Sequence, residues 1–280
     1  MMKYKNLLTR KIIVLLCLGL FFFYIIIGFY NPLTVTEYSY TSSKVPAAFD
    51  GYRITQISDF HCRDFGKEES DLIQTIRDTH PDIIVFTGDS IDDEHPIDNY
   101  AHLLEGIHDI APIYYINGNH EYDKLAPLAE SLALHEKYGV TNLNDNSVIL
   151  TRENDSILLS GLDFRKTMQN LRNDIDYANT SYFNILLYHG TDKFNGIAPY
   201  NYDLVLSGHT HGGIVCLPFI GGIISNEKEL FPKFDSGIYT VGYSTMISSR
   251  GLGDAAVPRF HNPREVVCIT LHSSKPESDS

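Results

Sequence analysis

The chain has 280 residues, an ordinary globular composition with 43% hydrophobic residues, and a formal net charge of −13. This length accommodates one sizeable α/β domain plus an appendage. Because the net charge is strongly negative and no basic stripe carries interleaved aromatic residues, a nucleic-acid polymer is excluded as an expected partner. The four cysteines, one of them inside an apolar run, do not form a disulfide framework.

The first thirty residues predict a membrane anchor. Residues 12–30 are uncharged and mostly apolar, close to the roughly twenty residues that a helix needs to cross hydrocarbon. Basic residues precede this run and are scarce after it until Lys44. The positive-inside rule therefore predicts a cytoplasmic basic tail at 1–11 and an extracytoplasmic domain.

A cleavable signal peptide is the alternative for the same segment. The end of the apolar run lacks the small-residue pattern of a cleavage site, and the run is longer than the apolar part of most signal peptides. The sequence thus favours an uncleaved, single-pass signal anchor in the cell membrane.

The next segment, 31–49, is polar and rich in Ser and Thr, which predicts a tether, although the alternation over 34–40 is also typical of an edge strand. The folded domain is expected over 50–272, with a polar tail at 273–280. Helices are predicted early in this domain and additional strands late. The predicted helices cover 68–80, 96–110 and 124–138, and the later strands cover 148–150, 156–160, 239–247 and 266–271.

Five further segments are short and apolar or alternating, as expected of strands, and each runs directly into a polar motif. They are 52–57 before Ser58-Asp59-Phe60-His61, 82–87 before Gly88-Asp89-Ser90-Ile91-Asp92, 112–116 before Asn117-Gly118-Asn119-His120-Glu121, 184–188 before His189-Gly190, and 203–207 before Gly208-His209-Thr210-His211. Ligands bind at the carboxyl ends of strands in open α/β sheets. The repetition therefore predicts that these motifs converge in space.

The side chains of these motifs are suited to a pair of divalent metal ions. Aspartate, asparagine and histidine together give a mixed nitrogen and oxygen donor set, which suits Mn, Fe and Zn better than Mg or Ca. Two such ions about 3.5–4 Å apart can clamp a phosphoryl group, and a carboxylate can bridge them. Each motif alone also fits a turn or a surface loop, so the prediction depends on their order after five strands.

The ordered set resembles the calcineurin-like metallophosphoesterase family, whose motifs run D-x-H, G-D-x-x-D, G-N-H-E/D, H and G-H-x-H. The resemblance covers roughly residues 50–270, and the segment 243–265 also resembles the tail of a membrane-anchored bacterial branch of that family. The fold that it implies is α/β: two stacked mixed β-sheets flanked by helices, an αββα sandwich.

The resemblance also implies a role for each matched residue. Asp89 would bridge two metal ions. The first ion would be held by Asp59, His61, Asp89 and His211, and the second by Asp89, Asn119, His189 and His209. His120 would act on the substrate phosphate as a general acid or electrostatic clamp, and Asp92 would hydrogen-bond His120 and fix its tautomer. The implied reaction is in-line attack on phosphorus by a metal-bridging hydroxide.

The sequence therefore predicts a membrane-anchored phosphoesterase that depends on two divalent ions, Mn, Zn or Fe, and hydrolyses phosphate mono- or diesters. Its substrate would be a phosphorylated small molecule or a lipid-linked one. One alternative is a pyrophosphatase acting on a lipid-linked or acylated UDP-sugar. Another is a non-catalytic, metal-dependent cell-wall-binding protein, against which His120 and Asp92 argue, because binding alone needs no oriented acid.

The Gly-rich, apolar segment 218–236 directly follows the His211 motif. We expect either that it borders the site and meets membrane or an acyl chain, or that it folds onto the core.

Overall fold

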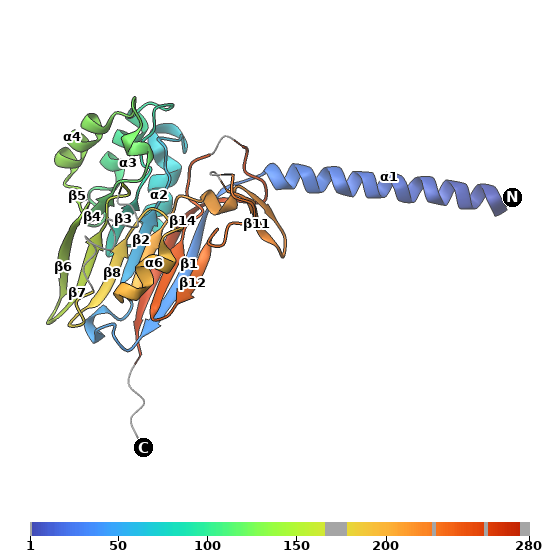
Figure 1. Ribbon diagram of the computed structural model, residues 1–280. Coiled ribbons are helices and arrows are strands. Elements are labelled where there is room, and N and C mark those ends of the chain that lie inside the picture. The colour runs from blue at the N-terminus through green and yellow to red at the C-terminus, as the bar shows by residue number, and fades with distance from the viewer. Residues whose placement is uncertain (1, 166–177, 226–227, 255–256, 275–280) are drawn as a thin grey trace, which may run out of the picture.

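A computed structural model describes residues 2–165, 178–225, 228–254 and 257–274. Two six-stranded mixed sheets stack on each other, with helices on their outer faces (Figure 1). A long helix, α1 (Met2–Phe29), projects away from this layered body. The predicted fold class, two stacked mixed sheets flanked by helices and preceded by an apolar helix, is confirmed.

The first sheet has the strand order β1-β14-β2-β3-β4-β5. Its strands are β1 (Leu33–Ser42), β14 (Arg264–Ser273), β2 (Arg53–Ile57), β3 (Ile83–Thr87), β4 (Ile113–Ile116) and β5 (Thr141–Asn142). The helices on its outer face are α2 (Ser70–Asp78), α3 (Asp98–Ile107) and α4 (Leu128–Tyr138). Because β2, β3 and β4 are parallel neighbours, their carboxyl ends lie at one edge.

The second sheet has the order β12-β13-β9-β8-β7-β6. Its strands are β12 (Gly237–Val241), β13 (Ser244–Ser248), β9 (Leu204–Ser207), β8 (Phe183–Leu187), β7 (Asp155–Gly161) and β6 (Asn146–Arg152). The short helix α6 (Phe194–Ile197) packs on its outer face. The single strand predicted over 239–247 was wrong: the chain turns at Gly242, with a φ of 60°, and divides the segment into β12 and β13.

A small hairpin of β10 (Val215–Leu217) and β11 (Gly221–Ile224) lies outside both large sheets. Short 3-10 turns complete the described elements: η1 (Ala47–Phe49), η2 (Lys67–Glu69), η3 (His120–Tyr122), η4 (Ala198–Tyr200) and η5 (His211–Gly213). Two of these turns, η3 and η5, are formed by the predicted polar motifs themselves.

Apolar packing explains why the strands before the motifs are so regular. The main core lies between the sheets and joins side chains such as Ile54 and Val85 of the first sheet to Ile185 and Leu204 of the second. Every residue of β3, β4, β8 and β9 is buried. These strands therefore need apolar side chains on both faces, which is the continuous pattern that identified them in the sequence.

Most of the segment expected as a tether belongs to the first sheet. Strand β1 pairs in parallel with β14 along its whole length, from Leu33 opposite Arg264 to Ser42 opposite Ser273. The alternation over 34–40 therefore marks an edge strand. Of the predicted polar tail, residues 275–280 lie outside the described part of the chain.

Helix α1 is long and apolar enough over Thr9–Phe29 to cross a membrane, a property that signal sequences share. Its carboxyl end is fixed to the domain. The Phe29 and Tyr24 rings pack against Phe260, and the His261 amide donates to the Gly28 carbonyl at 2.7 Å. The helix and the domain are therefore joined by direct contacts as well as by the chain.

One buried histidine far from the strand ends affects stability. His135 of α4 is 4% exposed, and the Tyr100 hydroxyl lies 2.8 Å from its Nε2. Burial lowers the pKa of His135 to about 4, whereas an imidazole in an unfolded chain has a pKa of about 6.5. Below pH 6.5 the imidazole of His135 therefore binds a proton more tightly in the unfolded chain than in the folded protein. The free energy of unfolding falls as the pH drops towards 4.

We predict that His135→Gln, which keeps an acceptor for Tyr100, weakens this pH dependence. Between pH 7.5 and pH 5 the original protein should lose about 2 kcal/mol more stability than the variant. Urea unfolding of both proteins at both pH values measures the difference. An equal loss in the two proteins would contradict a buried, neutral His135.

Candidate metal centre

The carboxyl ends of β2, β3 and β4 from the first sheet meet those of β8 and β9 from the second. The structure brings six of the seven predicted ligand side chains together there in groups whose donor atoms lie within 4.8 Å of one another. The groups are Asp59, His61 and His211; Asp89, His189 and His209; and His61, Asp89 and His120. The first two groups are parts of the two ligand sets that the sequence predicted.

The third group joins the first two and includes the predicted general acid. The rings of His61 and His120 stand 4.7 Å apart, and His61 Nε2 lies 3.9 Å from Asp89 Oδ2. Asp89 is fully buried and is shared by the second and third groups. It therefore lies between the histidines of the two predicted sites, which is the position that a bridging carboxylate needs.

The backbone at these residues adopts a conformation that non-glycine residues rarely take. Five of them have left-handed φ angles between 49° and 73°: Asp59, His61, Asp89, His209 and His211. This conformation is unfavourable for an L residue and persists where the surrounding structure imposes it, as at binding sites. In each case the chain leaves a buried strand and turns sharply to direct a side chain to the common centre.

Two glycines make this convergence possible. A Cβ at Gly208 would lie 1.8 Å from Ser58 Oγ and 2.4 Å from Asp59 Oδ2, and a Cβ at Gly88 would lie 2.6 Å from His189 Nδ1. The distances to Asp59 and His189, both predicted ligands, are far inside van der Waals contact. The glycines that flank the motifs are thus required by close approach between loops.

The residues present fit a pair of divalent ions. Among the described residues, buried atoms without a hydrogen-bond partner include His61 Nε2 and Asn119 Oδ1. Buried polar atoms are normally paired, and both atoms belong to residues of the predicted ligand sets. The donor set of imidazole nitrogens, carboxylates and one amide oxygen matches the preferences of Mn, Fe and Zn.

The hydrogen bonds of His189 orient it towards Asp89. Its Nδ1 lies 2.7 Å from the Thr87 carbonyl oxygen, which can only accept, so Nδ1 carries a proton and Nε2 faces Asp89 Oδ2 at 3.0 Å. Burial lowers the pKa of His189, but the charge of Asp89 outweighs burial and raises this pKa to about 9. A cation bound here would therefore replace a proton on Nε2.

The two aspartates are carboxylates in spite of their burial. Burial alone would raise the pKa of Asp59, but His211 and His189 lower it, and His189 and His61 likewise lower the pKa of Asp89. His211 differs from His189: burial outweighs the attraction of Asp59 and lowers the pKa of His211 to about 3. A neutral imidazole is the form that binds a metal ion.

Asp92 does not occupy the position that the sequence predicted for it. It was expected to hydrogen-bond His120, but Asp92 Oδ2 lies 2.8 Å from His95 Nδ1 and 3.5 Å from His61 Nδ1. Its Oδ1 accepts the amides of Glu94 and His95, which closes a local turn and draws the carboxylate to that side.

His120 begins the η3 turn, so its carboxylate partner comes from the same turn. Its Nδ1 lies 2.6 Å from Asp123 Oδ2, three residues later. Asp92 therefore contacts His61 and His95 instead of His120, and the carboxylate within ion-pair distance of His120 is that of Asp123.

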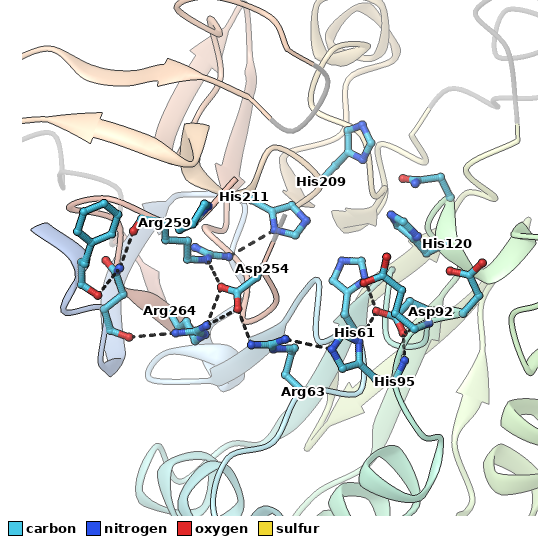
Figure 2. A pocket seen from close by; sticks show the side chains of 16 residues that line it. His61, Arg63, Asp92, His95, His120, His209, His211, Asp254, Arg259 and Arg264 are labelled. Carbon is cyan, nitrogen blue, oxygen red and sulfur yellow. Dashed lines mark hydrogen bonds and ion pairs between the residues drawn. The ribbon is translucent and has the colours of Figure 1, made fainter. Parts of the chain in front are cut away.

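A cavity of about 770 Å³ opens beside these groups. Figure 2 shows His61, His120, His209 and His211 on one side and a cluster of arginines on the other. Several cavity-lining residues had no predicted role of their own in the sequence. They are Phe29, Asn31, Asp93, Glu94, His95, Asp254, Pro258, Arg259 and Arg264.

Three arginines surround one aspartate in this cavity. Asp254 accepts from Arg63 at 2.5 Å and from Arg264 at 2.6 Å, and Arg259 Nε stands 3.8 Å away. Arg259 is 3% exposed, and its Nη2 lies 3.5 Å from His211 Nδ1. The cluster, Arg63-Asp254-Arg259-Arg264, therefore carries excess positive charge next to the candidate metal centre, inside a protein that is acidic as a whole.

Glu121 is a structural residue of the site that sequence reasoning missed. It is 1% exposed, and its carboxylate accepts the amides of Asp89, Ser90 and Gly118 at 2.6–3.0 Å. It thereby ties the loop after β3 to the loop after β4. The sequence signal was its place at the end of the Gly118-Asn119-His120-Glu121 motif, but a role in bonding amides of another loop depends on tertiary structure.

Comparison with known proteins adds an independent observation. The family model described as calcineurin-like phosphoesterase matches residues 52–213. The chain is 33% identical over 261 residues to the uncharacterized metallophosphoesterase YkuE of Bacillus subtilis, covering 87% of each chain. It is 28% identical over 271 residues to an uncharacterized metallophosphoesterase of Aquifex aeolicus, covering 89% of this chain and 98% of the other.

A third relative carries a named activity. The chain is 26% identical over 295 residues to the UDP-2,3-diacylglucosamine pyrophosphatase LpxG of Chlamydia trachomatis, and the match covers 84% of this chain and 88% of that one. All three matches cover at least 84% of this chain.

We predict that Gly208→Ala disrupts the centre although it changes no ligand. The added Cβ forces Ser58 and Asp59 away from the loop after β9, which should lower stability by about 1–3 kcal/mol and reduce the metal bound per chain. The control is Gly19→Ala in α1, where a Cβ meets nothing within 4 Å. Thermal unfolding and elemental analysis measure both effects, and an unchanged Gly208→Ala protein would contradict the close approach of the two loops.

Proposed function

The chain belongs to the calcineurin-like phosphoesterase family and is a metal-dependent phosphoester hydrolase; we propose that it works with two divalent ions and from a membrane anchor. Within this proposal the ions are held by Asp59, His61, Asp89 and His211 and by Asp89, Asn119, His189 and His209. Mn, Zn and Fe are the metals that this donor set favours.

One observation carries the proposal. Two groups of three donor atoms, each group within 4.8 Å, share no residue, and the buried Asp89 of the second group lies 3.9 Å from His61 of the first. A single metal ion would leave the donor atoms of one group, including its buried histidines, without a cation to bind. Two bound ions would supply Lewis acidity on both sides of a phosphoryl group and an activated water for its hydrolysis.

The side chains around the centre have distinct tasks in this proposal. His120 is partly exposed at the cavity, with Asp123 Oδ2 2.6 Å from its Nδ1, and its task is to contact a substrate phosphate or to protonate a leaving oxygen. Asp92 acts one step further away, as the partner of His61 Nδ1, and fixes the orientation of that predicted ligand.

The arginine cluster is suited to binding anionic groups of the substrate. Arginine forms paired hydrogen bonds with phosphate and carboxylate oxygens, and each such charged bond is strong. Arg63 and Arg264 are partly exposed and line the cavity. A phosphate ester bound at the metal centre can therefore place a further negative group against them.

We propose that α1 anchors the enzyme in the cell membrane as a single-pass helix, with residues 1–11 in the cytoplasm and the catalytic domain outside. The length and apolar composition of Thr9–Phe29 and the basic residues before it support this orientation. The predicted division into an anchor at 12–30, a tether at 31–49 and a catalytic domain over 50–272 forms part of the same proposal, with β1 of the tether segment joined to the first sheet.

The substrate proposed first is a phosphate mono- or diester. A second candidate is a pyrophosphate of a lipid-linked or acylated UDP-sugar, because a pyrophosphatase for UDP-2,3-diacylglucosamine is among the relatives. The structure offers one supporting contact, since Phe29 and Asn31 at the end of α1 line the same cavity as the catalytic residues. A lipid substrate would thus meet the anchor as it enters.

We predict that Asp89→Asn and His120→Ala separate metal binding from chemistry. Asp89→Asn should lower metal content at both positions and abolish activity, because its carboxylate is shared. His120→Ala should keep both ions and lose roughly 10²–10⁴-fold in rate. The measurement is hydrolysis of p-nitrophenyl phosphate and bis-p-nitrophenyl phosphate by metal-stripped protein refilled with Mn, Zn, Fe or Mg. Full activity of the Asp89→Asn protein would contradict the proposal that two metal ions share this carboxylate.

We predict that Arg63→Gln weakens substrate binding with little effect on metal content. Loss of a charged hydrogen bond to an anionic group should raise KM about ten-fold or more. Arg152→Gln, a partly exposed arginine on β6 at the far side of the second sheet, serves as the matched control. Equal KM values for the two variants on all phosphate substrates would show that the cluster does not contact substrate.

A further inference from the structure

The β10–β11 hairpin carries an apolar surface that no other described element covers. Phe219 and Ile220 form its tip and are 109% and 61% exposed. Leu230 and Phe231, joined to β11 by backbone contacts, are 66% and 62% exposed. We name Phe219 and Ile220 the apolar tip; Leu230 and Phe231 extend the exposed apolar surface along β11 towards its carboxyl end. An apolar surface of this kind in an otherwise acidic protein marks an interaction site.

The hairpin is held directly against the end of the anchor helix. Phe260 exchanges backbone hydrogen bonds with β10: the Cys216 amide donates to the Phe260 carbonyl at 2.8 Å, and the Phe260 amide donates to Ile214 at 3.0 Å. The same Phe260 ring packs against Tyr24 and Phe29 of α1. One residue thus links the hairpin to the last turns of the apolar helix.

This link sets where the apolar tip lies relative to α1. In Figure 1 the hairpin projects beside the point where α1 leaves the domain, on the side from which the helix extends. If α1 crosses a bilayer, the surface of that bilayer passes close to the hairpin. The apolar tip therefore lies next to the carboxyl end of α1, the part of the chain that the proposed anchor already places at the lipid surface.

We propose that the apolar tip inserts into the surface of the same bilayer that α1 spans, as a second membrane contact. The inference rests on the proposed anchoring and adds to it a defined orientation of the catalytic domain. With a helix and a hairpin as two separate contacts, the domain cannot rotate freely about its anchor. Phe and Leu side chains are suited to the boundary between headgroups and acyl chains.

The orientation determines what the cavity faces. Phe29, Asn31 and Pro258 line the cavity and belong to the segments on either side of the α1 junction. With the apolar tip in the bilayer surface, this rim stands at the headgroup level and the arginine cluster stands just above it. The site then draws its substrate from the membrane surface, and a phosphorylated lipid headgroup is the chemical class that reaches it.

The experiment uses the absence of tryptophan from the chain. The full-length protein is reconstituted into phosphatidylcholine vesicles whose acyl chains are either plain or brominated, since bromine quenches tryptophan fluorescence on contact. Single tryptophans are introduced by Phe219→Trp and Ile220→Trp at the tip. Phe22→Trp in the middle of α1 is the reference for the anchor. Tyr243→Trp is the control, an 88% exposed residue in the β12–β13 turn, at the opposite end of the second sheet from the metal centre.

We expect strong quenching for Phe22→Trp, clear quenching for both tip variants, and none for Tyr243→Trp. Quenching at Phe22→Trp with tip signals no different from the Tyr243→Trp control would overturn the inference and leave the anchor standing. No quenching at Phe22→Trp would contradict the proposed insertion of α1 into the bilayer, and with it the insertion of the hairpin. Equal quenching at the tip and at Tyr243 would also overturn it, because the contact would not be specific to the hairpin.

Discussion

The structure depends on one constraint: a fully buried carboxylate, Asp89, must be held between two groups of histidines without access to water. An isolated buried charge is very unfavourable. The Glu121 carboxylate accepts the Asp89 amide, and the His120 amide donates to Asp89 Oδ1 at 2.8 Å. Gly118 allows the approach, since a Cβ there would lie 2.2 Å from that oxygen. Much of the backbone geometry at the strand ends follows from positioning this group.

The charges around Asp89 explain why the centre needs cations. Burial and the neighbouring Asp89 raise the pKa of Glu121, while the histidines lower the pKa of Asp89. Negative groups are thus close together in a region of low dielectric, balanced by protons on imidazoles such as His189 and by the buried Arg259 guanidinium beside His211. Divalent ions would replace those protons and bind the unpaired donor atoms of His61 and Asn119. Metal binding and the stability of the strand-end loops are therefore linked.

The sequence predicted the sheets and the convergence of the motifs because continuous apolar runs, such as β3 and β8, identify buried parallel strands. It could not predict the partner of Asp92, because a local turn to His95 and the η3 turn at Asp123 decide which carboxylate meets which imidazole. No function was predicted for Arg259 either. Its position against the metal centre depends on a long-range return of the chain after β13, for which a single sequence gives no spacing rule.

The most direct test of the account is the position of the metal ions themselves. Crystals of the catalytic domain, or of the full-length protein in detergent, can be soaked with Mn and measured for anomalous scattering at the manganese edge. We predict two peaks about 3.5–4 Å apart, with Asp89 between them. Asp59, His61 and His211 should surround one peak, and Asn119, His189 and His209 the other. A single peak, or two peaks that do not share Asp89, would contradict it.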